Sequence, residues 1–250
     1  MILISKQYFT DFLKTFTKSN PEYYDTITEL SWPKDENGET DRERNPLIPN
    51  CWFKMLSLDD ICKDCTKFDN YNLPSTTDAL WYNIKDDGSL VIYFIEFKWH
   101  NLNRKKEDSN SCHDGNVEFK LRLKPFESLF IVLPTLFEDY CEKDNKKEFI
   151  DDLYDFLETC EIKVYSFVGN FYRKDGGINA EEDMSEKLRS SKTKSHLKRS
   201  RTIGPHGSIG NTIHKQYKRL ELSQLIDFAD VFPRSCFDAF LKTEGLIEDN

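Results

Sequence analysis

Two neighbouring segments rich in aromatic and β-branched residues constrain the fold of this chain more than any other feature. They are Thr77–Ile84 and Leu90–Lys98, and the connection Lys85–Ser89 between them contains an Asp-Gly pair. Such a connection is typical of a tight turn between antiparallel strands, so the sequence predicts a β-hairpin. The second segment is apolar on both faces from Leu90 to Ile95, which predicts a central strand covered on both sides.

The spacing of apolar residues elsewhere predicts the order of the other elements. Tyr8–Phe16 has helical spacing, and a second helical stretch is expected between Pro21 and Trp32. The charged segment Lys34–Asn50 is expected to be an exposed loop with little chemistry. The expected elements after the hairpin are a helix over 118–140 interrupted near its two prolines, a helix over 149–157, a strand over 162–171, and helix or mixed structure over 217–241.

Length and composition favour one α/β domain with a central mixed sheet flanked by helices. The chain has 250 residues, 38% of them hydrophobic, which suffices for one substantial core. We expect a core over 5–172, a basic mobile loop over 175–212 and a helical C-terminal extension that packs over 213–245. No apolar run approaches the ~18 residues of a membrane span, and the N-terminus lacks a secretory pattern. A cytoplasmic protein with reduced cysteines is therefore expected.

The register of the hairpin brings two acidic residues together. If the turn is centred on Asp87, then Ile84 faces Leu90, and Asp78 faces Glu96 at the other end of the strands. Facing residues of an antiparallel pair have Cβ atoms roughly 4.5–5.5 Å apart on one face of the sheet. Two carboxylates are thus expected side by side at the end of a buried hairpin.

Lys98 should join this pair, because side chains two residues apart on a strand point to the same face. Two close, buried carboxylates repel each other and require a cation. Mg²⁺ (or Mn²⁺) suits such hard oxygen ligands, here Asp78, Glu96 and the backbone carbonyl of Phe97. A metal in this place would activate water against a phosphodiester, with Lys98 orienting or deprotonating that water. The alternative is a cross-strand ion-pair cluster without catalysis, against which the apolar character of the strand argues.

Asp78 followed by Glu96-Phe97-Lys98 on an apolar strand resembles the motif of the PD-(D/E)XK nuclease superfamily, whose members are restriction-endonuclease-like. The resemblance covers about residues 5–172 and rests on a short motif, with Thr77 and not Pro before Asp78. It implies an αβββαβ core and metal-dependent cleavage of DNA, less often RNA. It also implies that a leading helix sometimes adds a carboxylate, for which Glu22 and Glu29 are the candidates.

Other motifs offer weaker alternatives. A second Glu-x-Lys sequence, at 118–120 after Asp114, would be the site if that region were a strand. Lys120, Lys124 and Glu127 face either the site or solvent if residues 118–140 form a helix. Cys62 and Cys65 have the spacing of zinc ligands, but without a matching second pair they are interpreted as ordinary free cysteines.

The segment 187–201 carries seven basic residues and no acidic ones, so the rest of the chain has a net charge of −16, against −9 for the whole. Such a run is typical of a solvated loop and equally of a surface that attracts phosphates. The residues predicted to contact nucleic acid are Lys192, Lys194, Lys198, Arg199 and Arg201. We therefore predict a nuclease acting on DNA in preference to RNA. The alternatives are an inactive nuclease-like module that binds nucleic acid or protein, and a protein that only contacts other proteins. The oligomeric state stays open, a homodimer included.

Overall fold

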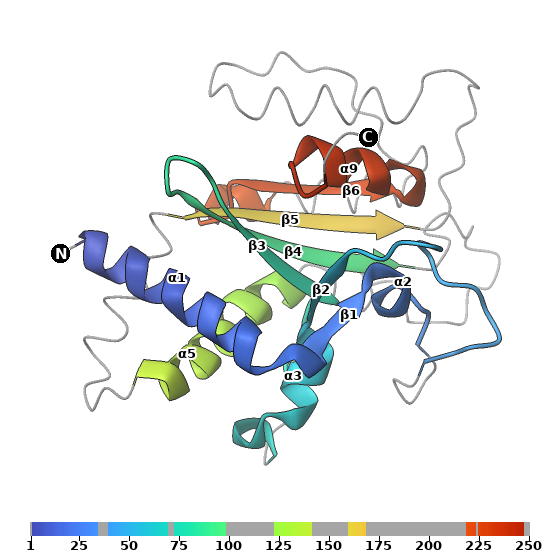
Figure 1. Ribbon diagram of the computed structural model, residues 1–250. Helices are drawn as coiled ribbons and strands as arrows, with labels where there is room; N and C mark the ends of the chain where they lie inside the picture. Colours follow the sequence, from blue (N-terminus) through green and yellow to red (C-terminus); the bar gives the residue numbers. More distant parts are fainter. Residues whose placement is uncertain are drawn as a thin grey trace.

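The computed structural model describes residues 2–34, 40–69, 73–98, 123–141, 160–168, 219–223 and 225–247. Four predictions fall outside these ranges. They are the helix over 149–157, the alternative site at 114–120, the basic mobile loop over 175–212, and the contacts predicted within it, Lys192, Lys194, Lys198, Arg199 and Arg201. The described residues form an α/β fold in which helices cover both faces of one sheet (Figure 1).

The sheet has six strands, and their order in the sheet follows their order in the chain. The first four strands pair antiparallel, whereas the fourth, fifth and sixth run parallel. The sheet is therefore mixed, as predicted. The strands are β1 (Tyr24–Thr26), β2 (Lys54–Ser57), β3 (Ala79–Ile84), β4 (Leu90–Lys98), β5 (Glu161–Val168) and β6 (Phe228–Pro233).

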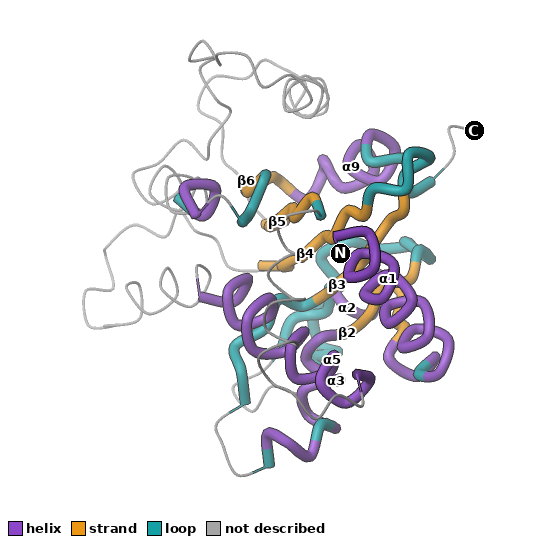
Figure 2. The backbone as a smooth tube through the Cα atoms, turned by 90° about the vertical axis from the view of Figure 1, so that its left-hand side faces the viewer, coloured by secondary structure: helices purple, strands orange, loops and turns teal. Residues whose placement is uncertain are grey.

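Helices pack on the two faces of this sheet, and Figure 2 shows α9 on one side of the strands with α3 and α5 on the other. The α-helices are α1 (Ile2–Ser19), α2 (Ile27–Leu30), α3 (Leu58–Asp64), α5 (Leu133–Cys141) and α9 (Phe237–Thr243). The short turns are η1 (Pro21–Tyr23), η2 (Thr66–Phe68), η3 (Ser128–Val132), η4 (Leu220–Ser223) and η5 (Arg234–Cys236). Among the described helices, none has the length and apolar character that crossing a membrane requires.

The hairpin has the register that the sequence predicts. Tyr82 pairs with Ile92 and Ile84 pairs with Leu90. At the turn, the Lys85 amide donates to the Ser89 carbonyl at 2.8 Å, and Gly88 adopts a φ of 76°, which only glycine adopts without strain. The Asp-Gly chemistry therefore fixes the register of both strands.

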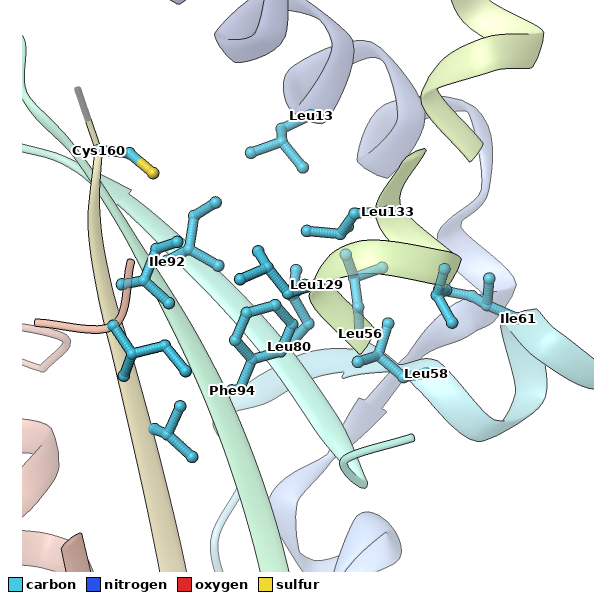
Figure 3. Close-up of a cluster of buried hydrophobic side chains, with 14 of the residues drawn as sticks. Leu13, Leu56, Leu58, Ile61, Leu80, Ile92, Phe94, Leu129, Leu133 and Cys160 are labelled. Atoms are coloured by element: carbon cyan, nitrogen blue, oxygen red, sulfur yellow. The ribbon is translucent and has the colours of Figure 1, made fainter. Parts of the chain in front are cut away.

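Alternation along β4 divides the core between the two faces. Leu90, Ile92 and Phe94 pack in one cluster with residues of α1, α3 and α5. Figure 3 shows Ile92 and Phe94 in this cluster. The intervening residues Val91 and Tyr93 pack on the other face, where α2 and α9 lie. Every side chain of β4 before Lys98 is buried, which confirms the prediction of a central strand covered on both sides.

The helix after the hairpin is continuous over residues 123–141, so neither proline breaks it. The expected interruption near Pro134 takes the form of the π-helical turn η3, which ends just before α5. Proline has no N–H and clashes with the carbonyl of the preceding turn, and a wider turn relieves both problems.

Two predictions for the outer segments were wrong in part. Residues 40–50 form no helix or strand, as expected of a loop, but Leu47 and Ile48 are buried under the sheet. The C-terminal segment is not only a helical extension, because it also supplies β6, which pairs with β5. Its apolar run is short, and periodicity alone does not separate a buried strand of that length from a helix.

Candidate active site

Asp78 lies immediately before β3 and is fixed by contacts on both sides. Its carbonyl accepts a hydrogen bond from the Leu58 amide at 3.4 Å. Its carboxylate oxygen Oδ2 accepts one from the Phe97 amide at 2.6 Å. Because the hairpin pairing ends at Ala79 and Ile95, the next facing residues are Asp78 and Glu96. The structure therefore brings together the two carboxylates that the sequence predicts.

Glu96 is fully buried, although it carries a carboxylate. Its Oε1 atom contacts the ammonium group of Lys98, so the third predicted residue also joins the site. The Lys98 side chain is 22% exposed and lies at the border between core and solvent. Within the described part of the chain, Oε1 has contacts with cations but no hydrogen bond of acceptable geometry.

Lys124, on the helix over 123–141, supplies a second cation. Its Nζ atom lies 2.9 Å from each carboxylate oxygen of Glu96 and 3.6 Å from Oδ1 of Asp78. One ammonium group thus bridges both carboxylates. The sequence analysis left the direction of Lys124 open, and the structure turns it toward the site.

The same helix holds the segment that leads into Asp78. The side chain of Glu127 accepts a hydrogen bond from the Ser75 amide, and the hydroxyl of Ser128 accepts one from the Thr77 amide at 3.0 Å. Glu127 therefore faces the protein and not solvent. These contacts tie Asp78 and Lys124 to a common frame, which limits how far they move apart.

Asp59, in the first turn of α3, is an acidic neighbour that the sequence analysis missed. Its carboxylate accepts a hydrogen bond from the Thr76 hydroxyl and pairs with Lys34. Burial alone would raise the pKa of Asp59, but the charges of Lys34 and Lys124 lower it below the ordinary value. No pattern in the sequence connects α3 with the hairpin, so only the tertiary structure reveals this residue.

The pKa values at the site are shifted because two carboxylates lie close together and are shielded from solvent. Burial, and after it the nearby negative charge of Glu96, raise the pKa of Asp78, while the charges of Lys124 and Lys98 oppose them, and the resulting pKa is about 6. Burial would lower the pKa of Lys124, but the charges of Glu96 and Asp78 outweigh it and raise that pKa. Lys124 thus stays an ammonium ion at neutral pH, and the carboxylates depend on its charge.

A cavity of about 260 Å³ opens beside Asp78, between the ends of the first strands and α3. Of the two candidates for a further carboxylate, Glu29 lines this cavity and Glu22 does not. The carboxylate of Glu29 is held by Arg42 at 2.6 Å. The lining residues are Asp25, Glu29, Leu30, Lys34, Thr40, Arg42, Ser57, Asp60, Lys63 and Asp78.

The donor atoms suit a hard divalent cation, although they do not form a complete shell. Asp78 and Glu96 direct carboxylate oxygens at one position, which now holds the Lys124 ammonium. Among the described residues, no group of three or more His, Cys, Asp or Glu side chains is arranged to hold a metal ion. Waters or substrate oxygens would have to complete the coordination of Mg²⁺, which that ion commonly accepts.

The cysteines that had zinc-like spacing are free in the structure. Cys62 is buried in α3, and burial raises the pKa of its thiol to about 12, which disfavours the thiolate that zinc requires. Cys51 and Cys65 are also free. These cysteines form no disulfide, and their interpretation as residues that bind no zinc stays a prediction.

Comparisons of the chain with protein-family models, with curated proteins and with solved structures found no match.

Proposed function

We propose that this protein is a metal-dependent nuclease that hydrolyses phosphodiester bonds, with DNA preferred over RNA. The observation that carries the proposal is one cation position shared by the buried carboxylate of Glu96 and the partly buried carboxylate of Asp78. The Lys124 ammonium occupies it, within 2.9 Å of Glu96 and 3.6 Å of Asp78. A fully buried glutamate beside a second acid is costly for stability, so its presence here favours a functional role.

The order of elements supports the more specific proposal of a restriction-endonuclease-like core. A helix, α1, precedes three antiparallel strands, β2, β3 and β4. The helix over 123–141 follows, and then β5, which runs parallel to β4. This order is compatible with the αβββαβ core that the resemblance to PD-(D/E)XK nucleases implies, with β1 and α2 added between α1 and β2 and α3 added between β2 and β3. Asp78 and Glu96 lie at the ends of the second and third of those strands.

The chain's own residues suggest how the reaction would proceed. Asp78, Glu96 and the carbonyl of Phe97 would hold Mg²⁺ or Mn²⁺, which supplies Lewis acidity and acidifies a bound water. Lys98 would keep its ammonium near that water and offset the charge that builds on the phosphate in the transition state. The Phe97 amide holds Asp78 Oδ2 at 2.6 Å and leaves Oδ1 for the cation.

The partner proposal rests on charge. A chain with a net charge of −9 repels a polyanion on average, so DNA would be attracted where positive charge is concentrated. The predicted contacts Lys192, Lys194, Lys198, Arg199 and Arg201 would supply this attraction by releasing counterions from the phosphates. The second candidate function is an inactive module with the same fold, which the ion pairs filling the site would favour.

The test is cleavage of plasmid, linear and single-stranded DNA and of RNA, with Mg²⁺ or Mn²⁺ and with EDTA. We expect metal-dependent cleavage by the wild type and a loss of at least about a hundredfold in Glu96→Gln and Lys98→Met. The matched controls are Glu161→Gln and Lys85→Met, which break an ion pair of the same kind at the far end of the hairpin. These controls should retain full activity.

Absence of cleavage of every substrate by the wild type would reject the enzyme. If nucleic acid still bound and Glu96→Gln left the binding unchanged, the inactive module would be the correct function. Cleavage that survived in both site variants would place the active site elsewhere in the chain.

A further inference from the structure

The ammonium of Lys124 fills the place that a divalent cation would need, and this arrangement has consequences for how a metal binds. The inference rests on the proposed function, because it concerns the same pair of carboxylates. The Nζ atom lies at 2.9 Å from both oxygens of Glu96 and at 3.6 Å from Asp78. A metal ligated by both acids would lie roughly 2.1 Å from their oxygens. The two cations cannot share this space.

We propose that Lys124 is a resident counter-ion that a divalent metal displaces, so that metal binds by exchange with an ammonium group. In the absence of metal, Lys124 neutralises Asp78 and Glu96 and holds them together. When metal binds, the side chain leaves both acids. The observed metal affinity is therefore the difference between the binding free energies of the metal and of the Lys124 ammonium at the same two carboxylates.

Lys98 does not act in this way, although it also contacts Glu96. It pairs with a single oxygen of that residue and is 22% exposed, so its ammonium can swing into solvent. Lys124 is 15% exposed and bridges two acids from a helix that is hydrogen-bonded to the segment before Asp78. Displacement therefore requires the Lys124 side chain to find another position close to the site.

Asp59 lowers the free-energy cost of this displacement, because it offers the Lys124 ammonium a second carboxylate. Its carboxylate accepts a hydrogen bond from the hydroxyl of Thr76, two residues before Asp78, and it lies close enough for the positive charge of Lys124 to lower its pKa. An ammonium that leaves Glu96 thus remains within the field of a second carboxylate. The structure offers the released side chain an anionic neighbour instead of an apolar one.

The first test measures Mn²⁺ binding to the full chain by calorimetry, without nucleic acid. Lys124→Met should bind Mn²⁺ at least tenfold more tightly than the wild type, because the competing cation is gone. Lys124→Arg, which keeps the charge, should bind no more tightly than the wild type. Lys98→Met should change the affinity less than Lys124→Met does. Equal or weaker binding by Lys124→Met, or no binding by any of these proteins, would overturn the proposal.

The second test uses the wild type alone and does not depend on whether a variant folds. Lysines are acetylated with and without saturating Mn²⁺, and the modified sites are measured by mass spectrometry. We expect Mn²⁺ to increase the acetylation of Lys124 severalfold. Lys163, which is 4% exposed and paired with Glu244, is the internal control and should not change. Unchanged protection of Lys124 at saturating Mn²⁺ would contradict the exchange.

These results are separable from the proposed function. Tighter Mn²⁺ binding by Lys124→Met in a protein that cleaves no nucleic acid would establish the exchange and reject the nuclease. Metal-dependent cleavage with unchanged Mn²⁺ affinity in Lys124→Met would support the nuclease and reject the exchange.

Discussion

The two faces of the sheet each bury a lysine with a glutamate, but the two clusters are built differently. On the α9 face, Glu244 accepts hydrogen bonds from Lys163 at 2.6 Å, Tyr165 at 2.8 Å and Tyr93 at 3.0 Å. On the opposite face, the Lys124 ammonium forms ion pairs with both Glu96 and Asp78. The first cluster has one carboxylate with several donors, and the second has two carboxylates that share a donor.

This difference separates a structural contact from a candidate site. Both oxygens of Glu244 have hydrogen-bond donors, and its side chain is 7% exposed, so the cluster anchors the end of α9 to β4 and β5. Glu96 Oε1, in contrast, lies near two ammonium groups without an acceptable hydrogen bond in the described structure. A fully hydrogen-bonded network makes a core rigid. Two adjacent carboxylates repel each other and need a cation, and a divalent ion can neutralise them better than one ammonium group.

The largest expected effect on stability comes from the α9 face. Glu244→Ala should lower the free energy of unfolding by about 3 kcal/mol, because it leaves a buried lysine and two buried hydroxyls without this acceptor. The free energy is measured by urea unfolding monitored by circular dichroism. Glu244→Gln, which keeps the acceptor oxygen but not the charge, should fall between the wild type and Glu244→Ala. A loss below about 1 kcal/mol in Glu244→Ala would show that this network does not anchor α9.

The next effect concerns the pH dependence of the metal-free protein. Because the folded-state pKa of Asp78 is raised to about 6, the native state holds a proton that the unfolded state releases near pH 4. This group therefore makes the protein less stable as pH rises from about 4 to about 6, by roughly 2 kcal/mol. Urea unfolding in EDTA across this range, with Asp78→Asn for comparison, measures the contribution. An identical pH dependence in wild type and Asp78→Asn would contradict the raised pKa.

The smallest effect is expected at the border of the α9 cluster. Glu161 pairs with Lys163 at 3.3 Å and also with Lys85, but its side chain is 32% exposed. Water screens such pairs, so Glu161→Gln should cost under about 1 kcal/mol in urea unfolding. A loss as large as that of Glu244→Ala would mean that Glu161, and not Glu244, is the main partner of Lys163.

The sequence predicted the hairpin and the residues it brings together because their positions follow from local rules. The Asp-Gly turn fixes the register, and the two-residue period of a strand then places Asp78, Glu96 and Lys98 on one face. These inferences need no knowledge of distant segments. They account for the part of the site that the sequence reveals.

The residues that the sequence did not assign come from other elements. Lys124 enters the site only because its helix docks on the hairpin through Ser128 and Thr77. Asp59 enters because α3 packs beside β3, the strand that begins directly after Asp78. Such tertiary placements leave no period in the sequence. The strand β6 was missed for another reason, because its apolar run is too short for periodicity to separate a buried strand from a helix.

An anomalous difference map from crystals grown with Mn²⁺ tests the central claim most directly. The two-carboxylate site predicts a peak roughly 2.1–2.3 Å from oxygens of both Asp78 and Glu96, with the Lys124 ammonium moved away from them. A map without that peak at saturating Mn²⁺, in which Lys124 still bridges both acids, would contradict the claim. It would leave the cluster as a buried ion-pair network, like the one on the α9 face.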